Sequence, residues 1–203
     1  MKTRESRLTH AAATRAAILA LLLAGCGTAL SLPPASVPIT QQQITLFSLT
    51  NTPVNTNSAY DMLQMLEVRI DQTNNFDFAF DLRFDSAYGI GKPGDTVAVL
   101  IPRGAMGFVA DPGLIALPGI FNFDSLQVAP TGGYTQDKAV AIHEGDVLYA
   151  ASRIQTCNFG FTLPHYAKLV IQKIDLAAYS TTILVVIDPN CGYREVNSGI
   201  PTF

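Results

Sequence analysis

Large apolar side chains occupy every second position between Phe76 and Phe84. A period of two is the period of a β-strand, whose successive side chains point to opposite faces, whereas a helix repeats about every 3.6 residues. The sequence therefore predicts a strand that buries one apolar face. Three aspartates between and just beyond the apolar positions repeat every four residues, and we expect them to form a solvated face: Asp77, Asp81 and Asp85.

The chain from residue 44 onward continues as short apolar runs separated by turn-forming sequences such as Asp111-Pro112-Gly113. The full chain, with 48% apolar and 14% charged residues, is too hydrophobic for extended disorder over most of its length. We therefore expect one all-β domain over residues 44–203, an antiparallel sandwich or barrel. Its further strands are predicted at Thr96–Ile101, Ser125–Ala129, Lys138–Ile142, Asp146–Ile154, Tyr166–Ile174 and Thr181–Ile187.

Two segments of this domain need separate comment. Asp175–Ser180 joins the last two predicted strands and indicates a C-terminal hairpin. Ser58–Ile70 is ambiguous, because Met62 and Met65 belong to a set of residues at helical spacing. A strand over Leu66–Ile70 is the equally compatible alternative.

The N-terminus has the three zones of an export signal. A basic start is followed by the apolar run Ala16–Leu23, which is too short to span a bilayer as a permanent helix, and then by small residues. Leu23-Ala24-Gly25-Cys26 resembles the lipobox of bacterial lipoproteins, L-[AS]-[GA]-C. An ordinary signal peptide with an incidental cysteine is the alternative. The resemblance implies that residues 1–25 are a signal peptide, and that Cys26 is linked to diacylglycerol and acylated after cleavage.

A lipid on Cys26 would make the membrane a partner of the mature protein. Gly27 follows the cysteine where an aspartate would resemble the inner-membrane retention signal, which favours the outer membrane of the cell envelope. Residues 26–43 contain three prolines and no apolar period, so we expect an extended linker. After residue 25 the chain has a net charge of −6, which gives no electrostatic reason to bind nucleic acid and leaves the lipid as the membrane anchor.

Two cysteines belong to the predicted domain, Cys157 and Cys191, and both stand beside turn residues. The oxidising compartment of an exported protein makes a disulfide the default state of such a pair. Free thiols and a zinc site are the alternatives. With only His143 and His165 to complete a ligand set, the two cysteines match no short metal-ligand spacing, so we expect a disulfide and no metal site.

No short motif predicts catalysis. The G-x-G-x-x-G sequence Gly89–Gly94 precedes the predicted strand Thr96–Ile101 rather than the helix that a dinucleotide site requires, so we interpret it as a glycine-rich turn. The chain has no G-x-S-x-G, H-E-x-x-H or Walker sequence. We therefore expect no catalytic residues and no enzyme activity.

The predicted domain contains two histidines, His143 and His165, each at the edge of a predicted strand. Imidazole is a good ligand for iron or zinc, although a lone histidine at a strand edge is more often exposed or hydrogen-bonded. Met106, in the apolar loop Gly104–Gly107, is a third side chain of a type that can ligate haem iron.

Three segments occur in an order that is typical of one lipoprotein family. Phe76–Phe80 (FDFAF) resembles the aromatic-Asp-x-[AG]-Phe segment that begins the domain of HmuY-like haem-binding lipoproteins, and a glycine-rich turn follows in both. Tyr134–Lys138 and Tyr166–Ile171 resemble the later Y-x-x-D-K and YAKL-x-I segments of that family. The resemblance covers residues 60–190. It implies a mostly β domain on a lipid anchor that binds haem through two axial side chains, although Phe76 replaces the usual Trp and neither histidine aligns with a family ligand.

Two functions are therefore open. The first is a lipid-anchored binding module with an apolar pocket for haem or another small hydrophobic ligand. Its candidate haem ligands are His143, His165 and Met106. The second is a structural or interaction protein of the cell envelope without a small-molecule ligand.

Overall fold

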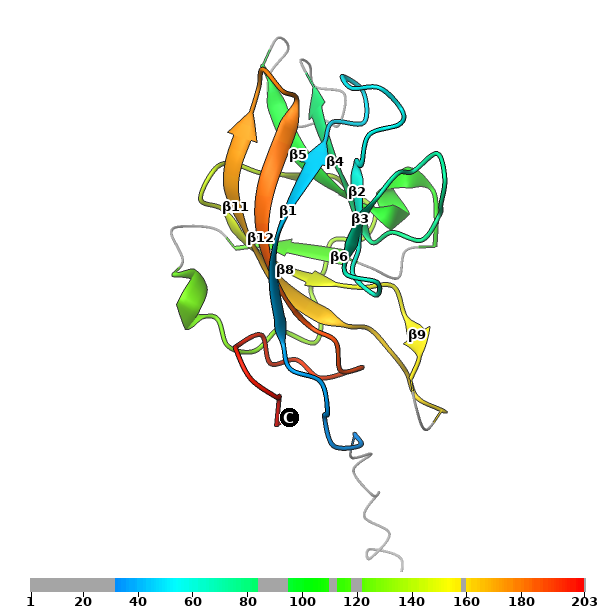
Figure 1. Ribbon diagram of the computed structural model, residues 1–203, viewed down its shortest axis with the longest axis vertical. Coiled ribbons are helices and arrows are strands. Elements are labelled where there is room, and N and C mark those ends of the chain that lie inside the picture. Colours follow the sequence, from blue (N-terminus) through cyan, green and yellow to red (C-terminus); the bar gives the residue numbers. More distant parts are fainter. Residues whose placement is uncertain (1–31, 84–94, 110–112, 118–121, 158–159, 203) are drawn as a thin grey trace, which may run out of the picture. The chain divides into compact units, whose positions relative to one another are not determined.

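The computed structural model of the chain describes residues 32–83, 95–109, 113–117, 122–157 and 160–202 (Figure 1). Two antiparallel five-stranded sheets dominate this part of the chain and pack face to face around a shared apolar core. The prediction of a single all-β domain with a sandwich architecture is thereby confirmed.

The two sheets are built from strands that are distant in sequence. Sheet A has the order β1-β12-β11-β8-β6 and sheet B has the order β3-β2-β4-β5-β7. The strands of sheet A are β1 (Thr40–Phe47), β12 (Ser180–Asp188), β11 (Tyr166–Asp175), β8 (Val147–Ala151) and β6 (Gly113–Ala116). Those of sheet B are β3 (Leu66–Val68), β2 (Ala59–Asp61), β4 (Phe78–Arg83), β5 (Val97–Pro102) and β7 (Val140–Ala141). A small separate sheet and two 3-10 turns complete the described elements: β9 (Gln155–Thr156), β10 (Thr162–Leu163), η1 (Arg103–Met106) and η2 (Phe123–Ser125).

The core lies between the inner faces of the two sheets. The alternation in β4 directs Phe78, Phe80 and Leu82 into this core, as the sequence predicts, and each of them is almost inaccessible to solvent. Apolar burial of this kind is the main source of folding free energy. Phe76 differs from the expectation, because it precedes the strand and packs with Ala79 in a second cluster on the outer side of sheet B.

Most of the other predicted strands are confirmed. The predicted segments yield β5, β7, β8, β11 and β12, and β11 pairs with β12 as the expected hairpin around Asp175–Ser180. Ser58–Ile70 contains β2 and β3, which pair with each other across a turn, so its helical alternative is wrong.

Ser125–Ala129 is not a strand. Its first residue ends η2, and Val128 makes only an isolated bridge to Glu195. Apolar residues of the segment pack in a cluster with Tyr149 of β8, on the outer face of sheet A. The apolar residues whose spacing suggested a strand thus cover the outer face of sheet A.

The predicted solvated face of β4 is also wrong. Asp77 and Asp81 are 1% and 0% exposed, because loop residues and η1 cover the outer face of sheet B. Asp81 Oδ1 accepts hydrogen bonds from Ser48 Oγ at 2.7 Å and from the backbone N–H of Thr50 at 3.1 Å. These bonds compensate the cost of burying a carboxylate and tie the loop after β1 to β4. Asp85 lies outside the described residues.

Strand β1 begins at Thr40, so residues 40–43, predicted as the end of the linker, belong to sheet A. The apolar alternation of β1 begins only at Ile44 and Leu46, because a glutamine occupies the inward-facing position before them. Gln42 Nε2 donates hydrogen bonds to Tyr60 OH and, at 3.1 Å, to Met65 O. A polar side chain on the inner face interrupts the alternation that marks a strand.

Residues 33–39, also predicted as linker, lie against the domain. Asn190 Oδ1 accepts hydrogen bonds from the backbone N–H groups of Ser36 and Val37, both at 3.1 Å, and Tyr193 OH donates to Pro33 O at 2.8 Å. Residues 33–39 are therefore not part of an extended linker, contrary to the prediction. Cys26 and residues 1–25 lie outside the described residues, and within those residues no helix is long and apolar enough to cross a bilayer.

Candidate functional site

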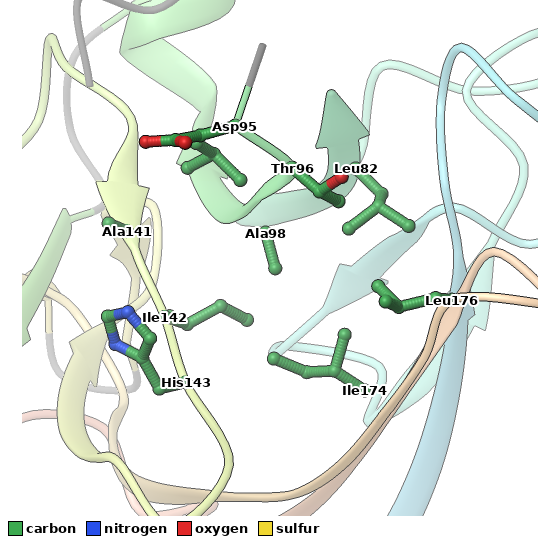
Figure 2. Close-up of a pocket in the computed structure, with 10 residues that line it drawn as sticks. Leu82, Asp95, Thr96, Ala98, Ala141, Ile142, His143, Ile174 and Leu176 are labelled. Carbon is green, nitrogen blue, oxygen red and sulfur yellow. The ribbon is translucent and has the colours of Figure 1, made fainter. Parts of the chain in front are cut away.

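A cleft opens at the end of the sandwich where the β11–β12 hairpin turns (Figure 2). This hairpin-end cleft has a volume of about 510 Å³. Sheet B contributes Leu82, Ala98 and Ile142 to its walls, and the hairpin contributes Ile174 and Leu176. Figure 2 shows Ile142, Ala98 and Ile174 directed into the space between these elements. The cleft is thus an apolar cavity open to solvent, of the kind that takes small molecules.

The rim of the hairpin-end cleft carries His143. Its ring lies on the opposite side of the chain from Ile142, as expected for consecutive residues of an extended segment, and 82% of the side chain is exposed (Figure 2). His143 Nδ1 is 3.2 Å from Asp146 Oδ2, and the same oxygen accepts the backbone N–H of His143 at 2.7 Å. A carboxylate at Nδ1 fixes the ring orientation and leaves Nε2 available, which is common among metal-ligating histidines. His143 can therefore meet a group at the rim but not at the apolar centre.

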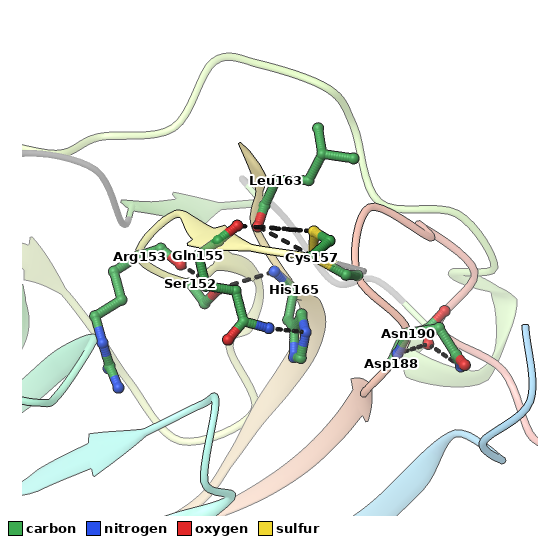
Figure 3. Close-up of a disulfide and its surroundings, with 9 residues drawn as sticks. Ser152, Arg153, Gln155, Cys157, Leu163, His165, Asp188 and Asn190 are labelled. Atoms are coloured by element: carbon green, nitrogen blue, oxygen red, sulfur yellow. Dashed lines mark hydrogen bonds between the residues drawn. A yellow bond between two sulfur atoms is a disulfide. The ribbon is translucent and has the colours of Figure 1, made fainter. Parts of the chain in front are cut away.

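The opposite end of the sandwich is closed by a disulfide between Cys157 and Cys191, so the predicted pairing is confirmed (Figure 3). Their Cα atoms are 5.9 Å apart. The bridge connects the residue after β9 to the loop after β12, near the point where Tyr166 pairs with Asp188. We call this the disulfide end of the molecule.

His165 is buried beside the disulfide, immediately before β11, with 5% of its surface exposed (Figure 3). Its Nε2 is 2.7 Å from Gln155 Nε2, and its backbone N–H donates to Ser152 Oγ at 2.8 Å. Nδ1 has no hydrogen-bond partner among the described residues. Burial, together with the positive charge of Arg153, lowers the pKa of His165 to about 4. The imidazole is therefore neutral at physiological pH.

An ion network next to His165 joins the two sheets, and no sequence motif predicts it. Arg153 follows β8 of sheet A, and its Nη2 lies 2.8 and 2.9 Å from the two carboxylate oxygens of Asp61, at the end of β2. Its Nη1 is 3.1 Å from Asp77 Oδ2, and its backbone N–H donates to Asp77 Oδ1 at 2.6 Å. Burial raises the pKa of Asp77 to about 6, against the lowering effect of Arg153. The sequence carries no local signal of this network, because an aspartate that alternates with Phe76 and Phe78 is also the pattern of a strand with one solvated face.

The structure does not bring the three candidate haem ligands together. His143 lies at the hairpin end, next to Gly145, whose N–H donates to Ile171 O. His165 precedes β11 and lies six residues before Ile171, which corresponds to about 20 Å at the rise of a strand. Met106 packs in the cluster on the outer side of sheet B and does not line the hairpin-end cleft. Ligation of one haem iron by both histidines of one chain is therefore incompatible with this fold.

Comparisons with known proteins do not assign a function. No protein-family model matches the chain, and no curated protein matches it. Across the described ranges, no group of three or more His, Cys, Asp or Glu side chains could hold a metal ion. The Gly89–Gly94 sequence lies outside those ranges. The geometry of the sandwich itself is therefore the basis for a functional proposal.

Proposed function

We propose that the chain is a lipid-anchored protein of the bacterial cell envelope, favouring the outer membrane, whose sandwich binds a small hydrophobic ligand in the hairpin-end cleft. The cleft itself carries the proposal. Its volume of about 510 Å³ is within the range of small-molecule sites, roughly 300–1,000 Å³, and most of its lining is apolar. Leu176 is 55% exposed at the opening, and a bound apolar ligand would cover it.

The path of the chain supports the combination of an anchor with this cleft. Thr40 pairs with Ile187 at the start of β1, so the chain enters the sandwich at the disulfide end (Figure 1). The hairpin-end cleft therefore opens at the end of the domain away from residue 33. A tether that begins at Cys26 would leave the opening accessible to a ligand.

Haem is one ligand that this proposal includes. Of the three candidate iron ligands, His143 is the one beside the cleft, and its position at the rim favours a single axial bond from this chain. Haem ligation by His165 is not part of the proposal, because its Nε2 is already paired with Gln155 at the other end of the domain.

Titration with hemin and with uncharged N-phenyl-1-naphthylamine tests the cleft. We expect saturable 1:1 binding of one or both by the wild type, and Leu176→Glu should weaken it about tenfold or more, because a charge is poorly accommodated in an apolar site. Ile154→Glu is the matched control, since Ile154 is 45% exposed and lies near the disulfide end. His143→Ala should shift the haem spectrum while His165→Gln leaves it unchanged. Absence of saturable binding for both probes would favour the envelope-interaction alternative.

The anchor has a separate test. Cys26→Ala should prevent labelling of the protein by radioactive palmitate and should leave residues 1–25 uncleaved. Normal labelling of this variant would contradict the lipobox interpretation without affecting the binding measurements.

A further inference from the structure

A second cleft lies on the outer face of sheet A, separate from the hairpin-end cleft. β1, β12 and β11 are neighbours there (Figure 1), and the strand register aligns Gln41, Val186 and Lys168 in one row across them. Residues of η2 and residues 196–198 form the walls around this row. The resulting space, the lysine cleft, has a volume of about 320 Å³.

Lys168 is the unusual feature of the lysine cleft, because only 4% of its surface is exposed. Its Nζ donates to the carbonyl oxygens of Phe123 at 3.0 Å and Leu126 at 2.9 Å, and it lies 4.6 Å from the centroid of the Phe123 ring. Since Phe123 also lines the space, these contacts hold the ammonium at the η2 wall. An ammonium has three N–H donors, and Nζ makes hydrogen bonds to only two oxygen atoms among the described residues.

The charge of Lys168 is not neutralised by an ion pair. Within the described part of the chain, no carboxylate oxygen lies within 4.0 Å of its Nζ. Burial lowers the pKa of Lys168, and the more distant Asp124 opposes this only in part. A buried cation without a counter-ion is unfavourable, so an anion in the adjacent space would gain a charge-assisted hydrogen bond.

The remaining walls restrict the kind of anion. Ile39, Phe123 and the edge of Val186 supply an apolar surface, and Asn197 and Ser198 supply polar side chains that can donate to an oxygen. Asp124 lines the same cleft and repels additional negative charge. The lining therefore suits one negative charge joined to an apolar body.

We propose that the lysine cleft binds the carboxylate of a small monocarboxylic acid with an apolar tail, with Lys168 as the group that receives the charge. The carboxylate accepts the remaining N–H of Lys168, and the tail lies along Ile39 and Val186. This site is independent of the hairpin-end cleft and of the ligand proposed there.

Calorimetric titration of the purified full-length protein with sodium hexanoate tests this site. The wild type should bind hexanoate with 1:1 stoichiometry and should discriminate against succinate, which carries two charges, and against 1-hexanol, which carries none. Lys168→Met should weaken hexanoate binding about tenfold or more, the loss expected for a hydrogen bond to a charged group. Asp124→Asn alters an exposed residue and should strengthen hexanoate binding and reduce the discrimination against succinate.

The control is Leu176→Glu, which alters the hairpin-end cleft and should leave hexanoate binding unchanged. No saturable binding of hexanoate by the wild type would overturn the proposal. The proposal would also be overturned by hexanoate binding that is the same in wild type, Lys168→Met and Asp124→Asn, or by binding that is lost in Leu176→Glu. Binding of hexanoate at the lysine cleft with no response to hemin or the naphthylamine would leave this site standing and remove the hairpin-end one.

Discussion

The two ends of the sandwich are held by different kinds of interaction. At the disulfide end, the Arg153 ion network joins the two sheets, and the Cys157–Cys191 bridge ties the segment after β9 to the loop after β12, beside buried His165. At the hairpin end, the inner faces of the same sheets separate around an apolar cleft with Leu176 half exposed. Strands β11 and β12 run through both regions, so the difference arises from the residues at their two ends.

This comparison indicates a division of roles along one pair of strands. The ionic contacts at the disulfide end join the two sheets, and the bridge fixes the loops there, whereas most residues that line the hairpin-end cleft are apolar. Substitutions at the disulfide end should therefore change mainly the free energy of unfolding, and substitutions at the hairpin end should change mainly binding. The following predictions test this division.

Replacement of Arg153 should have the largest effect. Arg153→Met removes the only cation within salt-bridge distance of Asp61 and Asp77 among the described residues, so the two buried carboxylates keep only hydrogen bonds from backbone N–H groups. We expect the free energy of unfolding in urea to fall by about 3–5 kcal/mol. Arg69→Gln is the control, because its pair with Asp71 is exposed to solvent and its loss should not change the unfolding midpoint. Equal stability of Arg153→Met and wild type would show that the ionic contacts do not hold this end.

Loss of the disulfide should come next. In a Cys26→Ser background, Cys157→Ser should lower the free energy of unfolding by about 2–4 kcal/mol and the Tm by several degrees, since the bridge closes a loop with a sequence separation of 34 residues. Addition of a reductant should lower the Tm of the protein that keeps Cys157 and Cys191 to that of the Cys157→Ser variant. The reductant should not change the Tm of the variant itself. Two thiols that react with maleimide in the native, unreduced protein would be inconsistent with the bridge.

The pH dependence of stability should carry the signature of His165. Its folded pKa of about 4 is below the unfolded value of 6.5, so the unfolded state takes up a proton first and stability is lost as the pH falls from 6.5 to 4. The loss attributable to this residue is at most about 3 kcal/mol. Urea unfolding of wild type and His165→Gln between pH 7 and pH 4 measures it as the difference between the two curves.

Two aspartates act in the opposite direction over nearly the same pH range, so the variant is essential to that measurement. Burial raises the pKa values of Asp77 and Asp188 to about 6, so both retain a proton in the folded state and stabilise it as the pH falls toward 3.8. Asp188→Asn should remove its share of this gain. Parallel curves for wild type and His165→Gln would mean that the imidazole is not kept neutral by burial.

The smallest change in stability is expected at the hairpin end. Leu176→Ser alters an exposed apolar side chain, so the free energy of unfolding should change by no more than about 0.5 kcal/mol. Binding of N-phenyl-1-naphthylamine should nevertheless weaken, because the variant removes part of the apolar wall. A stability loss as large as that of Cys157→Ser would erase the contrast between the two ends.

The sequence by itself was sufficient for the features that depend on local pattern. The alternation over Phe78–Leu82 identified a strand and its core face, because period-two patterns report directly which side of a strand is buried. Turn residues predicted the hairpin at Asp175–Ser180, and the cysteine chemistry expected of an exported protein predicted the Cys157–Cys191 bridge. Several residues of the hairpin-end cleft lie in predicted strands, but nothing local indicated that the strand ends separate there.

Only the tertiary structure decided what covers the outer faces and which distant residues meet. Asp61 and Arg153 are 92 positions apart, and Asp77 looked solvent-exposed because the loops that bury it are not strands and carry no period. His143 and His165 looked equivalent as strand-edge histidines, yet the register of β11 with β8 separates them along the length of the sandwich. Local spacing limits which face a side chain occupies, whereas burial on that face and convergence at a site depend on pairings made by the whole chain.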